Sequence, residues 1–289
     1  MATMLSTNMT GFIPKEVSQE IVKDMAYGST VLKMVKVEPM TSLEKTVPVL
    51  AKGAGAYFIN EGQKITVADA EWIFPTLQAK KIAVIIPMSK EVLNRASVDV
   101  FKELQSDIAE AFANKFDVAA LFGVDSPYTT NILGSATEAG NVFTIGSVAG
   151  QDLAGDISDT MALVEDGGFE VNGFIAPVRT KAKLRKANVG QVLNPVYLPE
   201  QGDSPATLYG LPVEYIRRNA PEGIEMIAGN FDYARAGILD NIQYEILREA
   251  TVGTLNLAEQ DMVALKATMN IAFLVVKNEA FAVAKEEAQ

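Results

Sequence analysis

The sequence predicts an α+β fold in which strands predominate outside one long helix. Apolar residues alternate with polar ones over residues 45–89 and in several runs after residue 211, and this period of two is typical of strands. Between Ser97 and Gly123, aromatic and aliphatic residues instead recur every three or four positions. That spacing predicts a single amphipathic helix about 38 Å long.

The amino-acid composition alone excludes several kinds of catalytic and metal site. The chain has 289 residues, 48% of them hydrophobic and 21% charged, which indicates one large globular domain or two ordinary ones. It contains neither His nor Cys. Imidazole and thiolate catalysis, disulfides and metal sites with His or Cys ligands are therefore excluded, and we predict no cofactor and no metal site.

Charge and hydropathy argue against two classes of partner, nucleic acid and membrane. The formal net charge of −11 disfavours a protein that reads nucleic acid, because such a surface repels phosphate. No apolar run reaches the roughly 18 residues of a membrane span, and the first ten residues lack the pattern of a signal peptide. The sequence thus predicts no membrane association.

The first 44 residues carry weak patterns. Residues 1–11 are small and polar and predict an extended arm, while Pro14 fits the first turn of a short helix that ends at Gly28. Residues 29–37 are apolar enough to be buried, but their pattern leaves helix and strand open.

The segment 45–89 predicts a long excursion of strands with a polar, glycine-containing tip. Pro48 marks an edge strand, because proline cannot donate to a ladder, and further strands are expected at 57–59, 72–77 and 80–86. Compact domains rarely contain such long excursions. Its aromatic residues Tyr57, Phe58 and Trp72 are candidate anchors for a partner, with a core position as the alternative for Trp72.

The long helix has a predicted core stripe and a predicted solvent side. The apolar stripe consists of Phe101, Leu104, Ile108, Phe112 and Phe116. The polar side is expected to contain Glu103, Ser106, Asp107, Glu110, Asn114 and Asp117. An aromatic stripe at helical spacing indicates a core face and not a cofactor site.

The remainder predicts a mixture of short elements. Residues 127–150 are expected to form loops and short strands, and 152–166 a helix with Asp156 on its solvated face. A buried strand at 174–176, a helix at 178–187 and a loop at 188–205 follow. Strands are expected at 211–217, 224–228, 234–239, 243–247 and across 262–284, with a helical or frayed end.

None of the short motifs predicts an active site. Ser42 and Lys45 match the S-x-x-K pattern of acylating enzymes but lack its partner motifs. Gly53 and Gly55 lack the third glycine and the helix of a dinucleotide loop. We therefore predict no catalytic residue, and an enzyme that uses carboxylates is the alternative from another class.

Several segments, in order along the whole chain, resemble the major capsid proteins of tailed bacteriophages, which have the Hong Kong 97-type shell fold. The opening FIPKEVSQEI at 12–21 resembles the family's "iP.evs.eii", and AYFINEGQKI at 56–65 resembles "a.wv.Eg..i". Residues 77–95 are similar to "l...kla....vS.ell" before the long helix. LYGLPV at 208–213 resembles "l.G.Pv", AGNF at 228–231 resembles "GDf", and AF at 280–281 resembles the closing "AF".

One further segment departs from the family pattern. KATMNIAF at 266–273 occupies the place of "r...R.D..v", so Lys266 and Asn270 stand where Arg and Asp are common. A local ion pair there is accordingly not expected.

The resemblance implies a division of the chain. The parts are an N-terminal arm (1–28), an extended β-hairpin loop (45–83), an axial domain (127–235) and a peripheral domain built from 29–44, 84–126 with the long spine helix, and 236–289. Contacts between subunits are expected from the extended loop, at Tyr57, Phe58, Glu61, Lys64 and Trp72.

The resemblance also implies a function. The chain is expected to self-assemble into hexamers and pentamers of an icosahedral phage head that encloses the DNA genome without sequence-specific binding. Because the arm follows directly on Met1, a separate scaffolding protein is expected, together with a portal, and assembly in the cytoplasm of the host bacterium. An encapsulin-type nanocompartment shell protein is the alternative within this fold.

Some relatives join a Lys of the extended loop to an Asn of a neighbour with the help of a Glu. Lys52 and Lys64 lie on the excursion, and Asn256 and Glu259 lie in a later loop. These residue types are common, so we expect assembly without covalent crosslinks.

Overall fold

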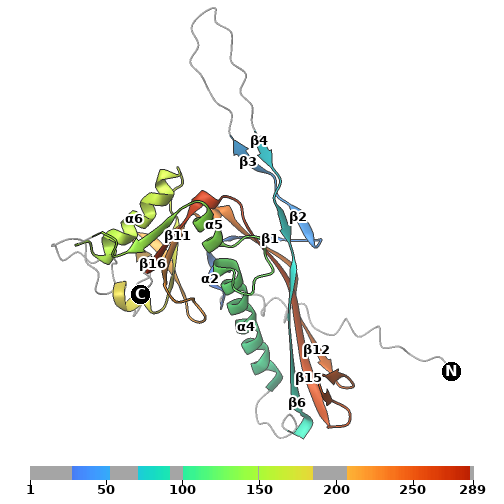
Figure 1. Cartoon of the computed structure of the whole chain (residues 1–289). Helices are drawn as coiled ribbons and strands as arrows, with labels where there is room; N and C mark the ends of the chain where they lie inside the picture. The colour runs from blue at the N-terminus through green and yellow to red at the C-terminus, as the bar shows by residue number, and fades with distance from the viewer. Residues whose placement is uncertain (1–27, 53–70, 92–99, 149, 185–206, 287–289) are drawn as a thin grey trace, which may run out of the picture.

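The computed structural model describes residues 28–52, 71–91, 100–148, 150–184 and 207–286. Its helices are α2 (Thr30–Met34), α4 (Val100–Phe122), α5 (Ile132–Glu138), α6 (Leu153–Asp166) and α7 (Thr180–Leu184). Two sheets form the body, and one hairpin projects from it (Figure 1). The predicted α+β fold is confirmed.

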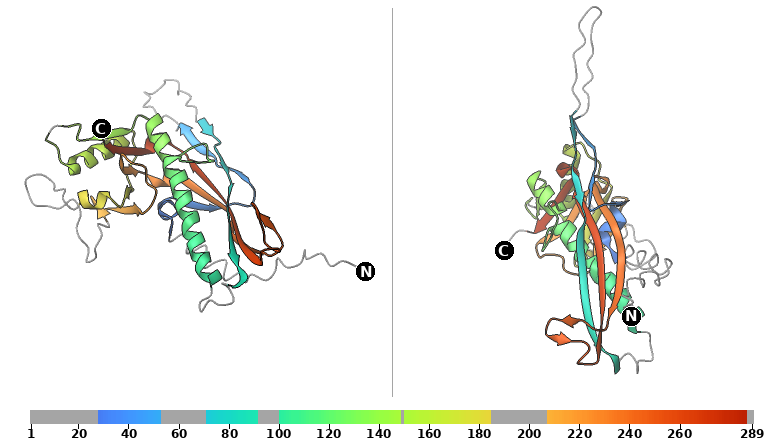
Figure 2. Two further views of the ribbon diagram at one scale, coloured as in Figure 1. Left: turned by 60° about the horizontal axis from the view of Figure 1, so that its bottom comes forward. Right: turned by 90° about the vertical axis from the view of Figure 1, so that its right-hand side faces the viewer.

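The first sheet has four strands. Their order is β1 (Lys36–Pro39), β12 (Ala234–Leu247), β15 (Met262–Val275) and β6 (Lys80–Ser89). β1 runs parallel to β12, whereas β12, β15 and β6 are antiparallel neighbours. Helix α4 runs alongside this sheet (Figures 1 and 2), and their apolar side chains share one core cluster.

The second sheet has six strands. Their order is β7 (Val142–Ile145), β16 (Phe281–Glu286), β11 (Ile224–Gly229), β8 (Gly173–Pro177), β10 (Leu211–Ile216) and β9 (Thr207–Leu208). Every residue of β8 and β11 is buried. Ile157 and Val164 of α6 pack against this sheet in a second cluster that includes Phe174.

The largest core cluster spans both sheets. Phe116 of α4 is fully buried and meets Phe273 of β15 edge to face, with the ring centres 6.1 Å apart. The Tyr128 hydroxyl donates to the Ile271 carbonyl oxygen at 3.2 Å beside them. Phe281 of the six-stranded sheet belongs to the same cluster, so the two sheets share one core.

Two neighbouring strands cross from one sheet to the other at the same level. A 3₁₀ turn, Phe231–Tyr233, joins β11 to β12, and a second, Asn278–Ala280, joins β15 to β16. The Asn230 amide donates to the Ala280 carbonyl oxygen at 2.9 Å, and the Val276 amide donates to the Tyr233 carbonyl oxygen at 2.8 Å. The two crossings are therefore hydrogen-bonded to each other.

Helix α4 ends where the sequence predicts. Gly123 follows its last residue with φ of +71°, the left-handed conformation that favours glycine at a helix end. A Cβ at Gly123 would lie 2.6 Å from Nδ2 of Asn131, whose side chain caps α5. The predicted start at Ser97 lies outside the described residues.

Two sequence predictions about the long strands are wrong. Residues 234–247 form one strand, not two, because register shifts between Ile238 and Gln243 break the alternation while the ladder to β15 continues. Residues 262–284 belong to two strands in different sheets. β16 pairs with β11 and β7, so the chain from residue 236 onward does not return to a single sheet.

The closing strand and α5 also differ from expectation. The strand expected up to Ala284 continues, as β16, to Glu286, and the first four residues of β16 are buried. Lys285 and Glu286, expected in a helical or frayed final turn, thus belong to the strand, while 287–289 lie outside the described residues. Ile132–Glu138, expected as loop or strand, is a helix despite its small polar residues. The Asn131 cap and buried Ile132 and Ala136 stabilise it.

Asp156 does not lie on a solvated face. It is 2% exposed, and Oδ2 of its carboxylate accepts from the Gly146 amide at 3.1 Å. The carboxylate thus holds the turn that precedes α6. The helix expected at 178–187 is described over Thr180–Leu184 only.

Candidate assembly surface on the projecting hairpin

The projecting hairpin has two ladder segments. Near the body, β2 (Glu44–Thr46) pairs with β5 (Thr76–Gln78), and farther out β3 (Val49–Lys52) pairs with β4 (Glu71–Ile73), both antiparallel. Figures 1 and 2 show this ladder extending beyond the two sheets. Residues 80–83, predicted as part of the extended loop, instead pair with β15 in the four-stranded sheet.

The hairpin carries a concentration of exposed apolar side chains. Trp72 is 55% exposed and Phe74 is 63% exposed, so the alternative of a core position for Trp72 is wrong. Leu50 lies directly opposite Trp72 in the ladder, which places both side chains on the same face. Leu43 and Ile73 are exposed as well. Exposed aromatic clusters of this kind mark protein interaction sites.

Four predicted contact residues are not described. Tyr57, Phe58, Glu61 and Lys64 lie within residues 53–70, outside the described part of the chain. Their role in subunit contact stays a prediction.

An apolar cluster fixes the root of the hairpin. Leu77 of β5 is fully buried and packs with Met40 and Val47 against Ala272 and Leu274 of β15. The cluster belongs to neither large core. The hairpin therefore has its own hydrophobic attachment to the four-stranded sheet.

Hydrogen bonds reinforce this root. The Val47 amide donates to the Pro75 carbonyl oxygen at 2.9 Å, and the Ala79 amide donates to the Leu43 carbonyl oxygen at 2.8 Å. Pro75 separates β4 from β5, so the single strand predicted at 72–77 is interrupted. Proline lacks the amide that an unbroken ladder requires.

A charged group links the root to the sheet. Glu38 of β1 contacts Lys45 of β2, with Oε2 and Nζ 2.6 Å apart, and its other oxygen accepts from Arg235 of β12. The Lys45 hydrogen bond lowers the pKa of Glu38; burial opposes this effect, and Arg235 adds to it. Sequence reasoning missed this contact, because Glu38 and Arg235 are far apart in the chain.

Lys266 and Asn270 make their contacts across strands. Lys266 Nζ lies 2.8 Å from Oε2 of Glu245, and Asn270 Nδ2 donates to Oδ2 of Asp240 at 2.6 Å. Both partners are on β12. Lys266 and Asn270 therefore do not pair with each other; each contacts β12, Lys266 by an ion pair and Asn270 by a hydrogen bond.

The five predicted core residues of the spine helix differ in burial. Ile108, Phe112 and Phe116 are buried, whereas Phe101 and Leu104 are half-buried and pack against the same cluster. Asp117, expected on the solvent side, is 3% exposed. The apolar run after it, VAALF at 118–122, was the available signal, because a helix that is hydrophobic all round is buried.

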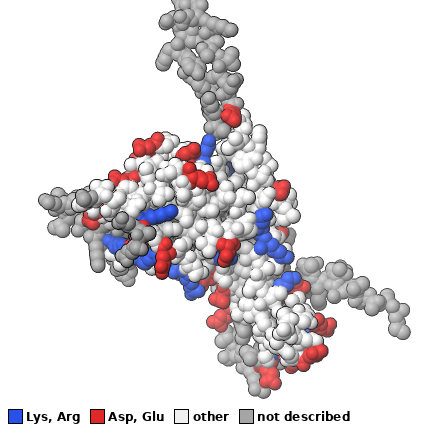
Figure 3. Space-filling view, in the orientation of Figure 1, with Lys and Arg blue, Asp and Glu red and all other residues white. Residues whose placement is uncertain are grey.

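Surface charge is mixed. Figure 3 shows acidic side chains scattered over the visible face, with Lys and Arg in separate patches. Arg179 and Lys183 lie 3.5 and 3.2 Å from the buried Glu225 carboxylate. No helix among the described ranges is long and apolar enough to cross a membrane. Within the same ranges, no group of three carboxylates is placed to hold a metal ion.

The chain is similar to known proteins over nearly its whole length. The sequence model of the "Phage capsid family" matches residues 10–285. The chain is 34% identical over 288 residues to the "Major capsid protein" of Staphylococcus phage 80alpha, covering 96% of this chain and 86% of that protein.

Solved structures have the same fold. A chain from Microbacterium phage Oxtober96 superimposes with a TM-score of 0.78 at 27% identity, covering 90% of this chain and 91% of that one. A chain from the "Capsid of empty GTA particle computed with C5 symmetry" superimposes with a TM-score of 0.64 at 17% identity, covering 90% of both. Because a family model spans nearly the whole chain and a curated relative shares a third of its residues, this chain belongs to the phage capsid family and is a component of the virion shell.

Proposed function

We propose that the chain is the major capsid protein that assembles into the hexamers and pentamers of an icosahedral head around DNA, and that its hairpin makes the principal contact with a neighbouring subunit. The observation that carries this proposal is the exposure of Trp72 and Phe74 on a hairpin whose root is buried. Full burial of a large apolar side chain stabilises a contact by about 1.5–3 kcal/mol. A closed shell repeats that gain at every subunit.

The test replaces the two aromatic residues. The double variant Trp72→Ser/Phe74→Ser is expected to give folded subunits that no longer sediment as particles, because the contact loses its apolar anchors. Val124→Ser is the matched control, since Val124 is 45% exposed on the body beyond α4. Particle formation by the double variant at the wild-type level would contradict the proposal.

The same proposal extends to the predicted contacts Tyr57, Phe58, Glu61 and Lys64. Deletion of residues 54–70 is expected to leave a soluble, folded subunit that forms no hexamers or pentamers. An unfolded chain after this deletion would show that the segment belongs to the core.

We also propose a revised division of the chain. The peripheral domain comprises residues 29–44, 79–126 and 236–280, because 80–83 pair with β15, and the axial domain comprises 127–235 together with 281–286. Pairing of β16 with β11 and β7 supports the change. The arm over 1–28 and the extended loop, now ending at Gln78, complete the division.

A separate scaffolding protein and a portal are proposed as assembly partners in the host cytoplasm. The exposed Trp72 and Phe74 support this, because an unassembled subunit exposes apolar surface that a helper protein can shield. Expression of the chain with and without the other head proteins of its phage tests the proposal. Uniform particles from the chain alone would contradict it.

DNA is proposed to be enclosed without sequence-specific binding. The net charge of −11 supports this, because an acidic surface repels phosphate, and Arg179 and Lys183 already face the Glu225 carboxylate. Retention of DNA by purified subunits at 200 mM salt, with a preference for one sequence, would contradict it.

Assembly is proposed to be noncovalent. Glu259 is exposed, which does not favour removal of a lysine proton, and Oδ1 of Asn256 accepts from the Ala258 amide at 3.2 Å within its own turn. Particles boiled in detergent are expected to give a single band near 31.1 kDa. A ladder of multiples would show crosslinks.

A further inference from the structure

A buried carboxylate of the spine helix supplies the hydrogen bonds that begin α2. Oδ1 of Asp117 accepts from the Ser29 hydroxyl at 2.5 Å and from the Val31 amide at 3.2 Å, and Oδ2 accepts from the Thr30 amide at 2.7 Å. The first amides of a helix have no partner within that helix. Asp117 therefore provides acceptors for the first two amides of α2, while the Ser29 hydroxyl accepts from the third, that of Leu32, at 3.1 Å. We call Asp117, Ser29, Thr30 and Val31 the latch.

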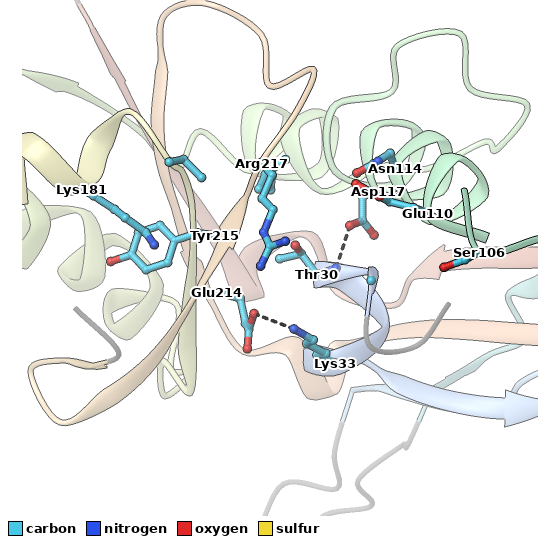
Figure 4. Close-up of a pocket in the computed structure, with 13 residues that line it drawn as sticks. Thr30, Lys33, Ser106, Glu110, Asn114, Asp117, Lys181, Glu214, Tyr215 and Arg217 are labelled. Atoms are coloured by element: carbon cyan, nitrogen blue, oxygen red, sulfur yellow. Dashed lines mark hydrogen bonds and ion pairs between the residues drawn. The ribbon is translucent and has the colours of Figure 1, made fainter. Parts of the chain in front are cut away.

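Thr30 and Asp117 of the latch line a groove of about 470 Å³ between α4, α2 and β10 (Figure 4). Gly28 lines the same groove and is followed by Ser29 of the latch. The latch therefore holds the first described residues against α4.

Hydrogen bonds alone offset the charge of Asp117. Among the described residues, no Lys or Arg forms an ion pair with its carboxylate. The charged groups of the groove are Lys33 of α2, Glu110 of α4, Glu214 of β10, Arg217 just after β10, and Lys181 of α7. Lys33 pairs with Glu214 at 3.4 Å, Glu110 lies 3.8 Å from Arg218, and Lys181 lies 4.2 Å from the centre of the Tyr215 ring.

Protonation of Asp117 is coupled to closure of the latch. Burial raises the pKa of Asp117 from 3.8 to about 6, although the hydrogen bonds from Ser29, Thr30 and Val31 oppose this effect. An opened latch exposes the carboxyl to water and returns its pKa toward 3.8. The closed state thus retains the proton to higher pH, so closure is favoured below about pH 4 and is weakened as the pH rises through about 6.

We propose that the latch is a proton-sensitive attachment of α2 to the spine helix, which tightens as the pH falls and loosens as it rises toward neutrality. The geometry supports a single titrating group, because each hydrogen bond among the latch residues ends on Asp117. The property belongs to the fold of one subunit and does not depend on how the hairpin contacts its neighbour.

Hydrogen exchange at the Thr30 and Val31 amides measures opening of the latch. In the full-length chain, the opening equilibrium is expected to increase on the order of 10- to 30-fold between pH 4.5 and 7.5, once the intrinsic exchange rate is divided out. All variants are compared with wild type in the same assembly state. A flat wild-type profile overturns the proposal.

Three variants identify the titrating group. Asp117→Asn removes the titration and is expected to flatten the profile to within 3-fold, whereas Glu110→Gln, on the same helix and groove but outside the latch, is expected to keep the wild-type profile. Ser29→Ala removes one hydrogen bond to the carboxylate, so the midpoint is expected to move to higher pH. A pH dependence that survives Asp117→Asn, or that Glu110→Gln abolishes, overturns the proposal.

Discussion

The C-terminal half of α4 and the hairpin contain similar apolar residues with opposite exposure. All seven residues of α4 from Phe116 to Phe122 are buried, whereas Leu50, Trp72 and Phe74 of the hairpin are exposed. Helix α4 meets a sheet and two other helices, while the outer ladder consists of β3 and β4 alone. Two strands cannot cover both of their own faces, so the described part of the chain leaves the hairpin's apolar residues exposed.

The largest effect is expected where burial is complete within one subunit. Phe116→Ala should lower the free energy of unfolding by about 3–5 kcal/mol, because it removes a fully buried ring from the shared core. Urea denaturation of the unassembled subunit measures the change. Glu110→Ala, on the exposed side of the same helix, is the control and should change stability by less than about 0.5 kcal/mol.

A substitution at the hairpin root tests whether the hairpin's attachment is separate from the core around α4. Leu77→Ala should lower the free energy of unfolding by about 2–4 kcal/mol, because Leu77 fills the small cluster that attaches the hairpin. Hydrogen exchange should increase most at Val47 and Ala79. Equal loosening across α4 would show that the root is part of the main core.

The charged link at the root should contribute less, with a defined pH dependence. Glu38→Gln should lower the free energy of unfolding at pH 7 by about 1 kcal/mol or less, since Lys45 and Arg235 are partly exposed. The folded state lowers the pKa of Glu38 below 4.5, chiefly through Lys45. Its contribution is therefore present above pH 4.5 and lost as the pH falls below it, so the difference between wild type and variant should shrink in acid.

The smallest effect on stability is expected at the exposed aromatics. Trp72→Ser/Phe74→Ser should change the free energy of unfolding of the unassembled subunit by less than about 0.5 kcal/mol, because both side chains are already more than half exposed. The thermal midpoint measures this. A loss comparable to that of Leu77→Ala would mean that the two aromatics stabilise their own subunit.

Local periodicity accounts for what the sequence could predict. The spacing of Ile108, Phe112 and Phe116 identified α4 and its inner face, and Gly123 marked its end. Alternation identified the hairpin, but Pro48, expected within an edge strand, lies between β2 and β3. These signals reside in neighbouring residues, so no knowledge of distant contacts is required.

The features that the sequence did not predict depend on contacts between residues that are far apart in the chain. Asp117 was placed on the solvent side because its partners, Ser29 to Val31, lie about 87 residues earlier. Glu38 reaches Arg235 only because β1 pairs with β12. β16 could not be assigned to its sheet, because its pairing with β11 and β7 has no local signature.

The paired crossings between the sheets have a mechanical consequence. Because β12 and β15 continue through hydrogen-bonded turns into β11 and β16, a load on one sheet reaches the other along two adjacent strands. Phe231 and Phe281, both fully buried with ring centres 5.6 Å apart, fill the space beside the turns. Twisting one sheet against the other would strain both crossings at once, while bending about the line through the two turns strains neither strand along its length. The paired crossings thus resist torsion between the two sheets more than bending about the line through the turns.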